Sequence, residues 1–249
     1  MTELERHKQD WEQLAGTDPL WAVLTDPRRK GGGWTREEFL ETGERQIEQL
    51  LERAAILERP AARRRAFDFG CGAGRLTRAL ASRFDEAVGV DVAEGMVEVA
   101  RQLNADVPNV TFEVNDRPDL ERFDSGSFDL VYTDLVLQHL PSRELLRRYV
   151  AELVRLTHAD GLLVFGVPVE LALLNRLQVS RRLYGLLRAL RVPESTILRR
   201  TPLTPMRMIW LPEDDVVRLV ASLGGELLDR ERPPDVPHYV RFWVAPGSR

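Results

Sequence analysis

A glycine-rich turn followed at a set distance by an acidic residue is the feature of this sequence with the clearest chemistry. Gly70, Gly72 and Gly74 alternate with other residues where an apolar run gives way to an amphipathic one. Glycines permit a tight turn and close approach of a ligand to the backbone, and N–H groups at a helix start attract negative charge. Asp91 ends the next apolar run, where a carboxylate can accept both hydroxyls of a ribose. The pattern predicts a nucleotide-type cofactor in an α/β fold.

The spacing of the glycines distinguishes this loop from a dinucleotide-binding turn. The order is G-x-G-x-G, and Arg75 stands where the dinucleotide pattern G-x-G-x-x-G needs a third small residue. Asp68 adds a carboxylate two residues before the first glycine. A tight turn with a structural acid nearby is the simpler alternative. The strand before the loop, the helix after it and the position of Asp91 favour a ligand site.

The elements that must position this loop alternate between short apolar strands and amphipathic helices. Strands that are apolar nearly throughout are typical of a parallel sheet covered by helices on both faces. The alternation predicts a Rossmann-like, doubly wound, mostly parallel α/β sheet. The expected strands are 64–69, 87–90, 110–114, 128–133 and 161–167, and the expected helices between them are 75–83, 94–103 and 142–157.

Two further regions flank this alternation. Residues 1–58 are expected to form an N-terminal helical cap or lid, with Gly31–Gly33 as a flexible joint. Its helix over 36–58 starts at a Thr35–Glu38 capping box. Residues 59–249 form the cofactor-binding domain. After the fifth strand this domain has a helical insert at about 170–206 (helix 171–191, then an irregular loop), a helix at 212–225 and a closing antiparallel hairpin of 225–232 and 238–245.

The motifs over about residues 64–168 resemble those of the class I S-adenosylmethionine (SAM)-dependent methyltransferases. AFDFGCGAGRLTRAL is similar to the first motif of that family and VGVDVAEGMVEVAR to the second. SFDLVYTDLVLQHLP resembles the fourth strand with its loop, and GLLVFGVP resembles the fifth strand. The resemblance implies a Rossmann-like methyltransferase domain that binds SAM and releases S-adenosyl-L-homocysteine (SAH).

The resemblance also assigns roles around the cofactor. Asp68 and the loop backbone would hold the methionine end, Asp91 the ribose, and Met96 would lie beside the adenine. Asn115 and Asp116 match positions that contact the adenine amino group, although a polar turn is an equal alternative. The expected cofactor-binding set is Asp68, Gly70, Cys71, Gly72, Gly74, Arg75, Asp91, Met96, Asn115, Asp116, Thr133, Asp134 and Leu135.

Methyl transfer from a sulfonium is an in-line displacement that needs alignment and a dry site, with a general base for some acceptors. His139 is the best-placed base, or else a structural histidine. Arg75 is expected either to pair with the cofactor carboxylate or to be an exposed helix residue. Trp21, Trp34 or Phe39 would lie near the sulfonium or simply pack in the core.

Composition narrows the class of acceptor. A net charge of −4 argues against a nucleic-acid substrate, and the polar start and lack of a long apolar run predict a soluble, cytoplasmic protein without a transmembrane segment. The single cysteine, Cys71, lies in the loop, which excludes a cysteine-nucleophile cytosine methyltransferase, and no cluster has metal-ligand spacing. O- or N-methylation of a small molecule or glycan remains. A non-catalytic SAM-binding regulatory module and an aminopropyltransferase are the alternatives, and the oligomeric state is open.

The insert after the fifth strand is strongly basic. Residues 171–200 contain seven arginines (176, 181, 182, 188, 191, 199 and 200) and one acid, Glu194. Leucines 173, 174, 177, 187 and 190 with Tyr184 form an apolar stripe at helical spacing. A packed helix with a solvated arginine face is one interpretation. Recruitment of an anionic acceptor by the arginines and contact with an anionic membrane are the others.

Overall fold

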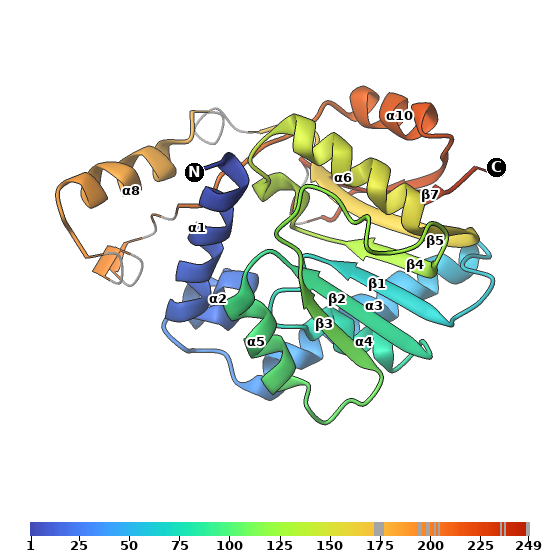
Figure 1. Cartoon of the computed structure of the whole chain (residues 1–249), viewed down its shortest axis with the longest axis horizontal. Helices are drawn as coiled ribbons and strands as arrows, with labels where there is room; N and C mark the ends of the chain where they lie inside the picture. Colours follow the sequence, from blue (N-terminus) through green and yellow to red (C-terminus); the bar gives the residue numbers. More distant parts are fainter. Residues whose placement is uncertain are drawn as a thin grey trace.

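A seven-stranded, mostly parallel sheet forms the centre of the protein (Figure 1). The computed structural model describes residues 1–171, 177–193, 196–197, 200–201, 203, 205–234, 236 and 238–247. The strand order is β3-β2-β1-β4-β5-β7-β6, with β1 to β5 parallel and β7 antiparallel to both neighbours. The expected fold is confirmed. The strands are β1 Arg65–Phe69, β2 Glu86–Asp91, β3 Val110–Val114, β4 Phe128–Thr133, β5 Thr157–Pro168, β6 Glu226–Glu231 and β7 Tyr239–Ala245.

Helices cover both faces of this sheet, because successive strand residues point to opposite sides and both sides are apolar. In β1, Ala66 packs with α3 and α4, whereas Phe67 packs in the cluster that includes α6 and α10. Figure 1 shows α6 and α10 on one side and α3, α4 and α5 on the other. These helices are α3 Arg36–Ile56, α4 Arg75–Ala81, α5 Glu94–Leu103, α6 Arg143–Leu156 and α10 Glu213–Ser222.

The expected N-terminal cap divides into two parts. Helix α3 starts at the expected Thr35–Glu38 capping box and covers the sheet. Three helical elements that were not predicted separately precede it: α1 Glu3–Thr17, α2 Pro19–Val23 and η1 Pro27–Arg29. The Glu12 carboxylate of α1 accepts the N–H groups of Glu94 and Gly95 at the start of α5, at 2.6 and 2.9 Å. The expected flexible joint is held in place, because Gly31 and Gly32 both donate to Asp18.

The insert differs from its prediction. Helix α8 spans Val179–Ala189 instead of 171–191, because Leu177 and Gln178 form a turn in which Gln178 has a φ of 53°. Thr196, Ile197 and Arg200 are helical where an irregular loop was expected. Several residues of the predicted stripe and charge cluster lie outside the described residues: Leu173, Leu174, Arg176, Glu194 and Arg199.

The contact between α3 and α4 depends on a residue without a side chain. A Cβ atom at Gly43 would lie 2.3 Å from the Arg75 carbonyl oxygen, closer than any real contact. At Gly185, within α8, no atom beyond its chain neighbours and the backbone of its own helix lies within 4 Å of the same position. Gly43 therefore permits the approach of α3 to the start of α4.

We expect Gly43→Ala to lower the free energy of unfolding by about 1–3 kcal/mol, because the helices must separate. Gly185→Ala is the matched control and should stabilise the protein by up to about 1 kcal/mol through helix propensity. Urea unfolding of both variants measures the difference. Equal effects of the two substitutions would contradict the assigned close approach.

Candidate functional site

A cavity of about 850 Å³ lies at the carboxyl ends of β1, β2 and β4. The strand order reverses between β1 and β4, and such a switch point is where α/β sheets bind ligands. Helices α1 and α2 contribute His7, Trp11 and Trp21 to its wall. Nine of the predicted cofactor-binding and catalytic residues line it: Gly70, Cys71, Gly72, Arg75, Asp91, Asn115, Asp134, Leu135 and His139.

The glycine loop is shaped by close contacts rather than by free N–H groups. Gly70 and Gly72 have φ values of +77° and +51°, and added Cβ atoms would lie 2.4 Å from Val136 and 2.5 Å from Val23. The N–H groups of residues 70 and 71 both donate to the Val90 carbonyl, and those of residues 72 and 74 donate to the Asp91 carboxylate and the Cys71 carbonyl. These four groups are therefore not available to an anion, whereas the prediction from the sequence concerned the N–H groups at the start of α4.

Asp91 is held at the end of β2 by two backbone donors. Its Oδ2 accepts the Gly72 N–H and its Oδ1 accepts the Ala93 N–H, both at 2.9 Å. A carboxylate offers about four acceptor positions, so about two remain for a ligand in the cavity. Burial raises the pKa of Asp91 to about 6. A neighbouring pair of hydroxyl donors would favour its charged form.

Asp68 lies behind the loop and does not line the cavity. It is 1% exposed and accepts the Thr77 hydroxyl at 2.7 Å, which ties the end of β1 to α4. Burial raises the pKa of Asp68 to about 6, because the charged form loses hydration. In the structure this carboxyl group braces the glycine loop.

Arg75 brings a buried positive charge to the cavity wall. It is 4% exposed, and its Nη1 donates to Gln46 of α3 at 2.9 Å. Its buried Nε has no hydrogen-bond partner in the part of the chain that the structure describes. Burial lowers the pKa of this guanidinium. An incompletely bonded guanidinium beside a cavity suits an anionic group of a ligand.

Asp134, after β4, is the centre of a buried polar network. Its side chain is 1% exposed and accepts hydrogen bonds from Tyr239 and Arg241 of β7, each at 2.9 Å, and from Gln46 at 2.7 Å. The Tyr239 hydroxyl in turn accepts the Leu135 N–H at 2.7 Å, and Leu135 lines the cavity with a φ of 60°. The network thus fixes the loop after β4.

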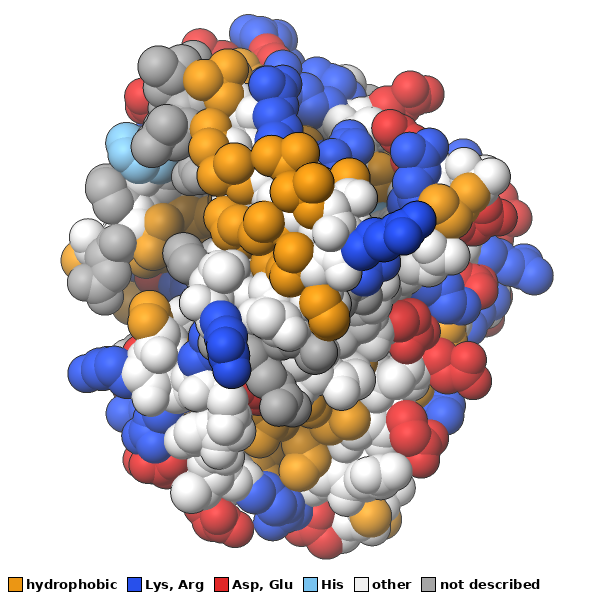
Figure 2. All heavy atoms as spheres, turned by 90° about the vertical axis from the view of Figure 1, so that its left-hand side faces the viewer, with side chains coloured by type: hydrophobic (Ala, Val, Ile, Leu, Met, Phe, Trp, Pro, Cys, Tyr) orange, Lys and Arg blue, Asp and Glu red, His pale blue; other side chains and the backbone are white. Residues whose placement is uncertain are grey.

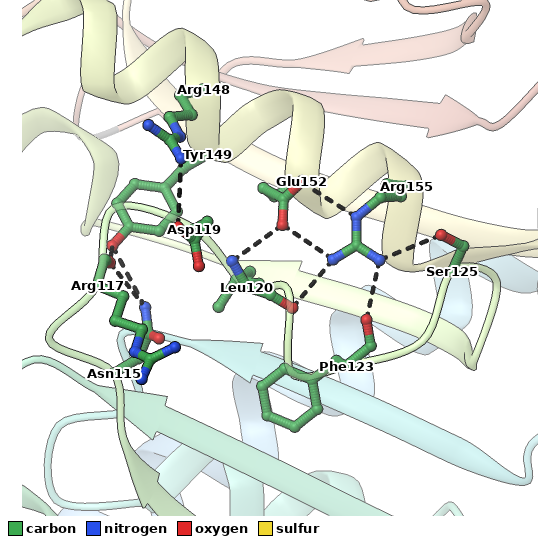
Figure 3. A network of polar contacts seen from close by, with 10 residues as sticks. All are labelled: Asn115, Arg117, Asp119, Leu120, Phe123, Ser125, Arg148, Tyr149, Glu152 and Arg155. Atoms are coloured by element: carbon green, nitrogen blue, oxygen red, sulfur yellow. Dashed lines mark hydrogen bonds and ion pairs between the residues drawn. The ribbon is translucent and has the colours of Figure 1, made fainter.

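The loop after β3 is anchored to α6 (Figure 3). Asn115 is buried at the cavity wall and donates to the Tyr149 hydroxyl at 3.3 Å, and Tyr149 donates to the Arg117 carbonyl. Further along the loop, Glu152 accepts the Leu120 N–H, and Arg155 contacts both Glu152 and the loop carbonyls. These bonds hold Asn115 in a set orientation.

His139 reaches the cavity from η2 (Leu137–His139) as a neutral ring. Its Nδ1 lies 2.9 Å from the Arg207 carbonyl, which can only accept, so the proton is assigned to Nδ1 and the lone pair to Nε2. Burial lowers the pKa of His139. The Gln138 amide nitrogen lies 3.3 Å from Nε2, and Trp11 packs edge-on against the ring. Nε2 is therefore the only ring atom suited to accept a proton.

The remaining predicted residues lie away from the cavity wall. Met96 is fully buried in the cluster with α1, and Thr133 is fully buried in β4. Gly74 is the N-cap of α4, and Asp116 pairs with Lys8 at 3.0 Å. Of the three candidate aromatic residues, Trp21 lines the cavity, whereas Trp34 and Phe39 pack against each other.

The cavity wall also contains residues that the sequence did not single out. His7 and Trp11 lie one helical turn apart on α1, and Tyr149 comes from α6. The Thr2–Glu5 capping box and this helical spacing were the available signals for α1. Among the described residues, no group of three or more His, Cys, Asp and Glu side chains could hold a metal ion, and no helix meets the length and apolarity that a membrane span requires.

Comparison with known proteins agrees with this architecture. Residues 67–165 match the family model described as a methyltransferase domain. The trans-aconitate 2-methyltransferase of Deinococcus radiodurans is 36% identical over 117 residues, which are 47% of this chain and 42% of that protein. The tocopherol O-methyltransferase of Arabidopsis thaliana is 28% identical over 72% of this chain and 49% of that protein. The chain thus spans less than half the length of these relatives.

Solved structures extend the comparison to the whole fold. The magnesium protoporphyrin IX methyltransferase of Synechocystis PCC 6803, crystallised with SAH, superposes with a TM-score of 0.64 at 16% identity, over 99% of this chain and all of that one. The doubly wound sheet and the switch-point cavity define a Rossmann-like α/β ligand-binding protein. Residues 67–165 thus match a methyltransferase domain, and the chain as a whole shares the fold of this solved methyltransferase.

The buried Asp68 carboxyl predicts a pH dependence of stability. Between about pH 4, where an unfolded Asp ionises, and pH 6, the folded state keeps a proton that the unfolded state has lost. Stability of the ligand-free protein should therefore fall as pH rises through this window. Asp68→Asn keeps an acceptor for Thr77 without the charge, and it should gain on the order of 2 kcal/mol relative to wild type.

Urea unfolding of wild type and Asp68→Asn at several pH values measures this difference. Asp85→Asn, at an exposed position, is the control and should follow wild type throughout. Parallel curves for wild type and Asp68→Asn would contradict a raised pKa at Asp68.

Proposed function

We propose that this protein is a SAM-dependent methyltransferase that acts on a small-molecule acceptor. The observation that carries the proposal is one continuous cavity lined by two chemically different sets of residues. One set is Asp91 with the glycine loop, which we assign to a first, cofactor end, and the other is His139, Arg181 and Arg200, which we assign to a second, acceptor end. A cofactor site that opens directly into a second, differently lined space is what group transfer requires.

The residues around the first end fit the cofactor. Gly70 and Gly72 keep the loop in a shape that an added Cβ atom would disturb by clashing with Val136 or Val23, and the free acceptor positions of Asp91 suit two ribose hydroxyls. Arg75 would meet the methionine carboxylate, and Asn115 would meet the adenine. When bound, SAM supplies a methyl group on an activated sulfonium. The protein's task is to align the acceptor and to exclude water.

The second end favours an acceptor that carries an anionic group. Lys30, Arg181 and Arg200 line it, and no carboxylate of the described residues forms an ion pair with them. The Lys30 ammonium lies 4.6 Å from the Trp21 ring centre and donates to the Thr201 carbonyl at 2.7 Å. The named acceptor of one relative, trans-aconitate, is itself an anion. The proposed reaction is O- or N-methylation of such a molecule.

His139 is the proposed general base for an acceptor that must lose a proton. Its lowered pKa keeps the ring neutral at pH 7, and Nε2 carries the lone pair. The Gln138 amide occupies that lone pair, so it would have to move away for the acceptor to bind. If His139 had only a structural role, the contact between its Nε2 and the Gln138 amide would stay intact during turnover.

A non-catalytic SAM-binding regulatory module is the second candidate function. It shares the glycine loop and Asp91 but has no use for an open acceptor space. Incubation of the protein with labelled SAM and a metabolite extract separates the two. Transfer of label to a small molecule, absent with Asp91→Ala, supports the enzyme. Tight SAM binding without any transfer across acceptor classes supports the module.

Asp91→Ala should weaken SAH binding about 100-fold, because two hydrogen bonds to a charged acceptor are lost. SAM should bind wild type with similar affinity, since most contacts are to atoms that the two ligands share. Asp116→Ala is the matched control and should bind SAH normally, because Asp116 pairs with Lys8 outside the cavity wall. Titration calorimetry gives both constants. Unchanged binding by Asp91→Ala would refute the ribose assignment.

We propose that α1 and α2 act as a lid over the bound cofactor. They line the cavity through Trp11, Trp21 and Val23, and α1 is held to α5 by the contacts of Glu12. Hydrogen exchange in residues 3–23 should slow when SAH is added, while exchange in α10 stays unchanged. Identical exchange of residues 3–23 with and without SAH would rule out the lid.

Charge reversal on α8 tests the anionic acceptor. Arg181 lines the cavity, whereas Arg182 is exposed and does not. Arg181→Glu should raise the acceptor KM about tenfold or more at low salt, because attraction becomes repulsion, and SAM binding should stay intact. Arg182→Glu is the matched control for soluble acceptors. Equal acceptor kinetics in the two variants would exclude recruitment by Arg181.

A further inference from the structure

Helix α8 carries a stripe of exposed leucines on its outer side. Leu183, Leu186 and Leu190 lie on one side of the helix, at steps of three and four residues, and are 45%, 56% and 67% exposed. Leu177, just before the helix, is 46% exposed. The opposite side packs inward through Tyr184, which is buried against α1. The helix therefore has two apolar sides, of which the protein covers one.

The exposed stripe lies in positively charged surroundings. Helix α8 contains Arg181, Arg182 and Arg188 and no acidic residue. Figure 2 looks at the side of the molecule on which α8 lies. It shows hydrophobic side chains gathered on the upper half of that face, with Lys and Arg along their top and right-hand edges. No described carboxylate forms an ion pair with Arg182. Apolar side chains bordered by arginines combine two attractions, toward apolar matter and toward negative charge.

We propose that α8 docks the protein onto an anionic lipid surface. Leucines 183, 186 and 190 would enter the boundary between headgroups and acyl chains, and the exposed Arg182 beside them would meet a lipid phosphate. Charge complementarity favours lipid over a second copy of this chain. A symmetric pairing through this face would bring two basic helices together, and their repulsion opposes the apolar contact.

The position of α8 links this surface to the cavity. Gln178, Val179, Ser180 and Arg181, at the start of α8, line the cavity wall. Docking would therefore bring the cavity close to the lipid surface, from which an acceptor with an apolar body and an anionic group can enter. This consequence rests on the proposed function. The docking itself needs neither cofactor nor acceptor, so the two can fail separately.

Vesicle flotation of the full chain tests the docking. We expect the protein to float with vesicles of phosphatidylglycerol and phosphatidylcholine in equal parts, and not with phosphatidylcholine alone. The double variant Leu183→Ser/Leu186→Ser should lose at least about tenfold in vesicle affinity, because its apolar stripe is removed. Ile56→Ser is the matched control, since Ile56 is 81% exposed at the end of α3, and it should float like wild type.

Charge is tested separately. Arg182→Glu should weaken binding to the anionic vesicles about tenfold or more, and 1 M salt should weaken wild type as well. Arg83→Glu, at an exposed position after α4, is the control and should bind normally.

Two results would overturn the proposal. One is no flotation of wild type with anionic vesicles at low salt. The other is flotation that the leucine variant retains. A concentration-dependent dimer that the leucine variant abolishes, in a protein that ignores vesicles, would assign the face to a second copy instead.

Discussion

The hydrogen bond from the Gly72 N–H to the Asp91 carboxylate is the contact on which the site depends. It joins the loop after β1 to the end of β2, two strands that pair side by side. Because the loop is pinned here, Gly70 and Gly72 take left-handed backbone conformations against Val136 and Val23. The carboxylate that pins the loop is also the one that presents free acceptor positions to the cavity. One residue thus serves both the shape and the chemistry of the site.

A second buried carboxylate, that of Asp134, fixes the loop after β4 in a similar way. It accepts hydrogen bonds from three donors in two distant parts of the chain, Gln46 of α3 and Tyr239 and Arg241 of β7. A buried charge is costly without partners, and here several donors surround it. Through Gln46 the same network reaches Arg75, so the guanidinium at the cavity wall is oriented by contacts that begin in β7. The family resemblance placed Asp134 beside the ligand, and the structure adds its role as the anchor of the loop after β4.

Much of this architecture could be predicted from the sequence, because local signals and the global fold agree in the core. The apolar strands, the Thr35–Glu38 capping box and the glycine loop all carry short-range patterns. The expected fold is confirmed, and residues 67–165 match a methyltransferase domain. The separate helices α1 and α2 were missed, although Thr2–Glu5 forms a capping box and Pro19 opens the second helix. Their apolar residues are few and spaced over short segments, so periodicity alone is weak there.

Other features depend on tertiary contacts that no sequence pattern encodes. The hydrogen bonds by which Val90 and Asp91 accept three N–H groups of the glycine loop were not predicted. Asp68 and Asp116 are close to the site residues in the sequence, but their carboxylates are bonded elsewhere. Asp68 accepts a hydrogen bond from Thr77, and Asp116 accepts one from Lys8. The helix expected over 171–191 starts only at Val179, where the backbone leaves the left-handed conformation of Gln178.

The central claim is that SAM occupies the space between Asp91 and the glycine loop and directs its sulfonium toward the acceptor end. A crystal structure of the complex with SAH tests it most directly. We predict that both ribose hydroxyls lie within hydrogen-bond distance of the Asp91 carboxylate, that Arg75 contacts the methionine carboxylate, and that the sulfur faces the space lined by His139 and Arg181. SAH bound elsewhere, or bound with its ribose away from Asp91, would contradict the account.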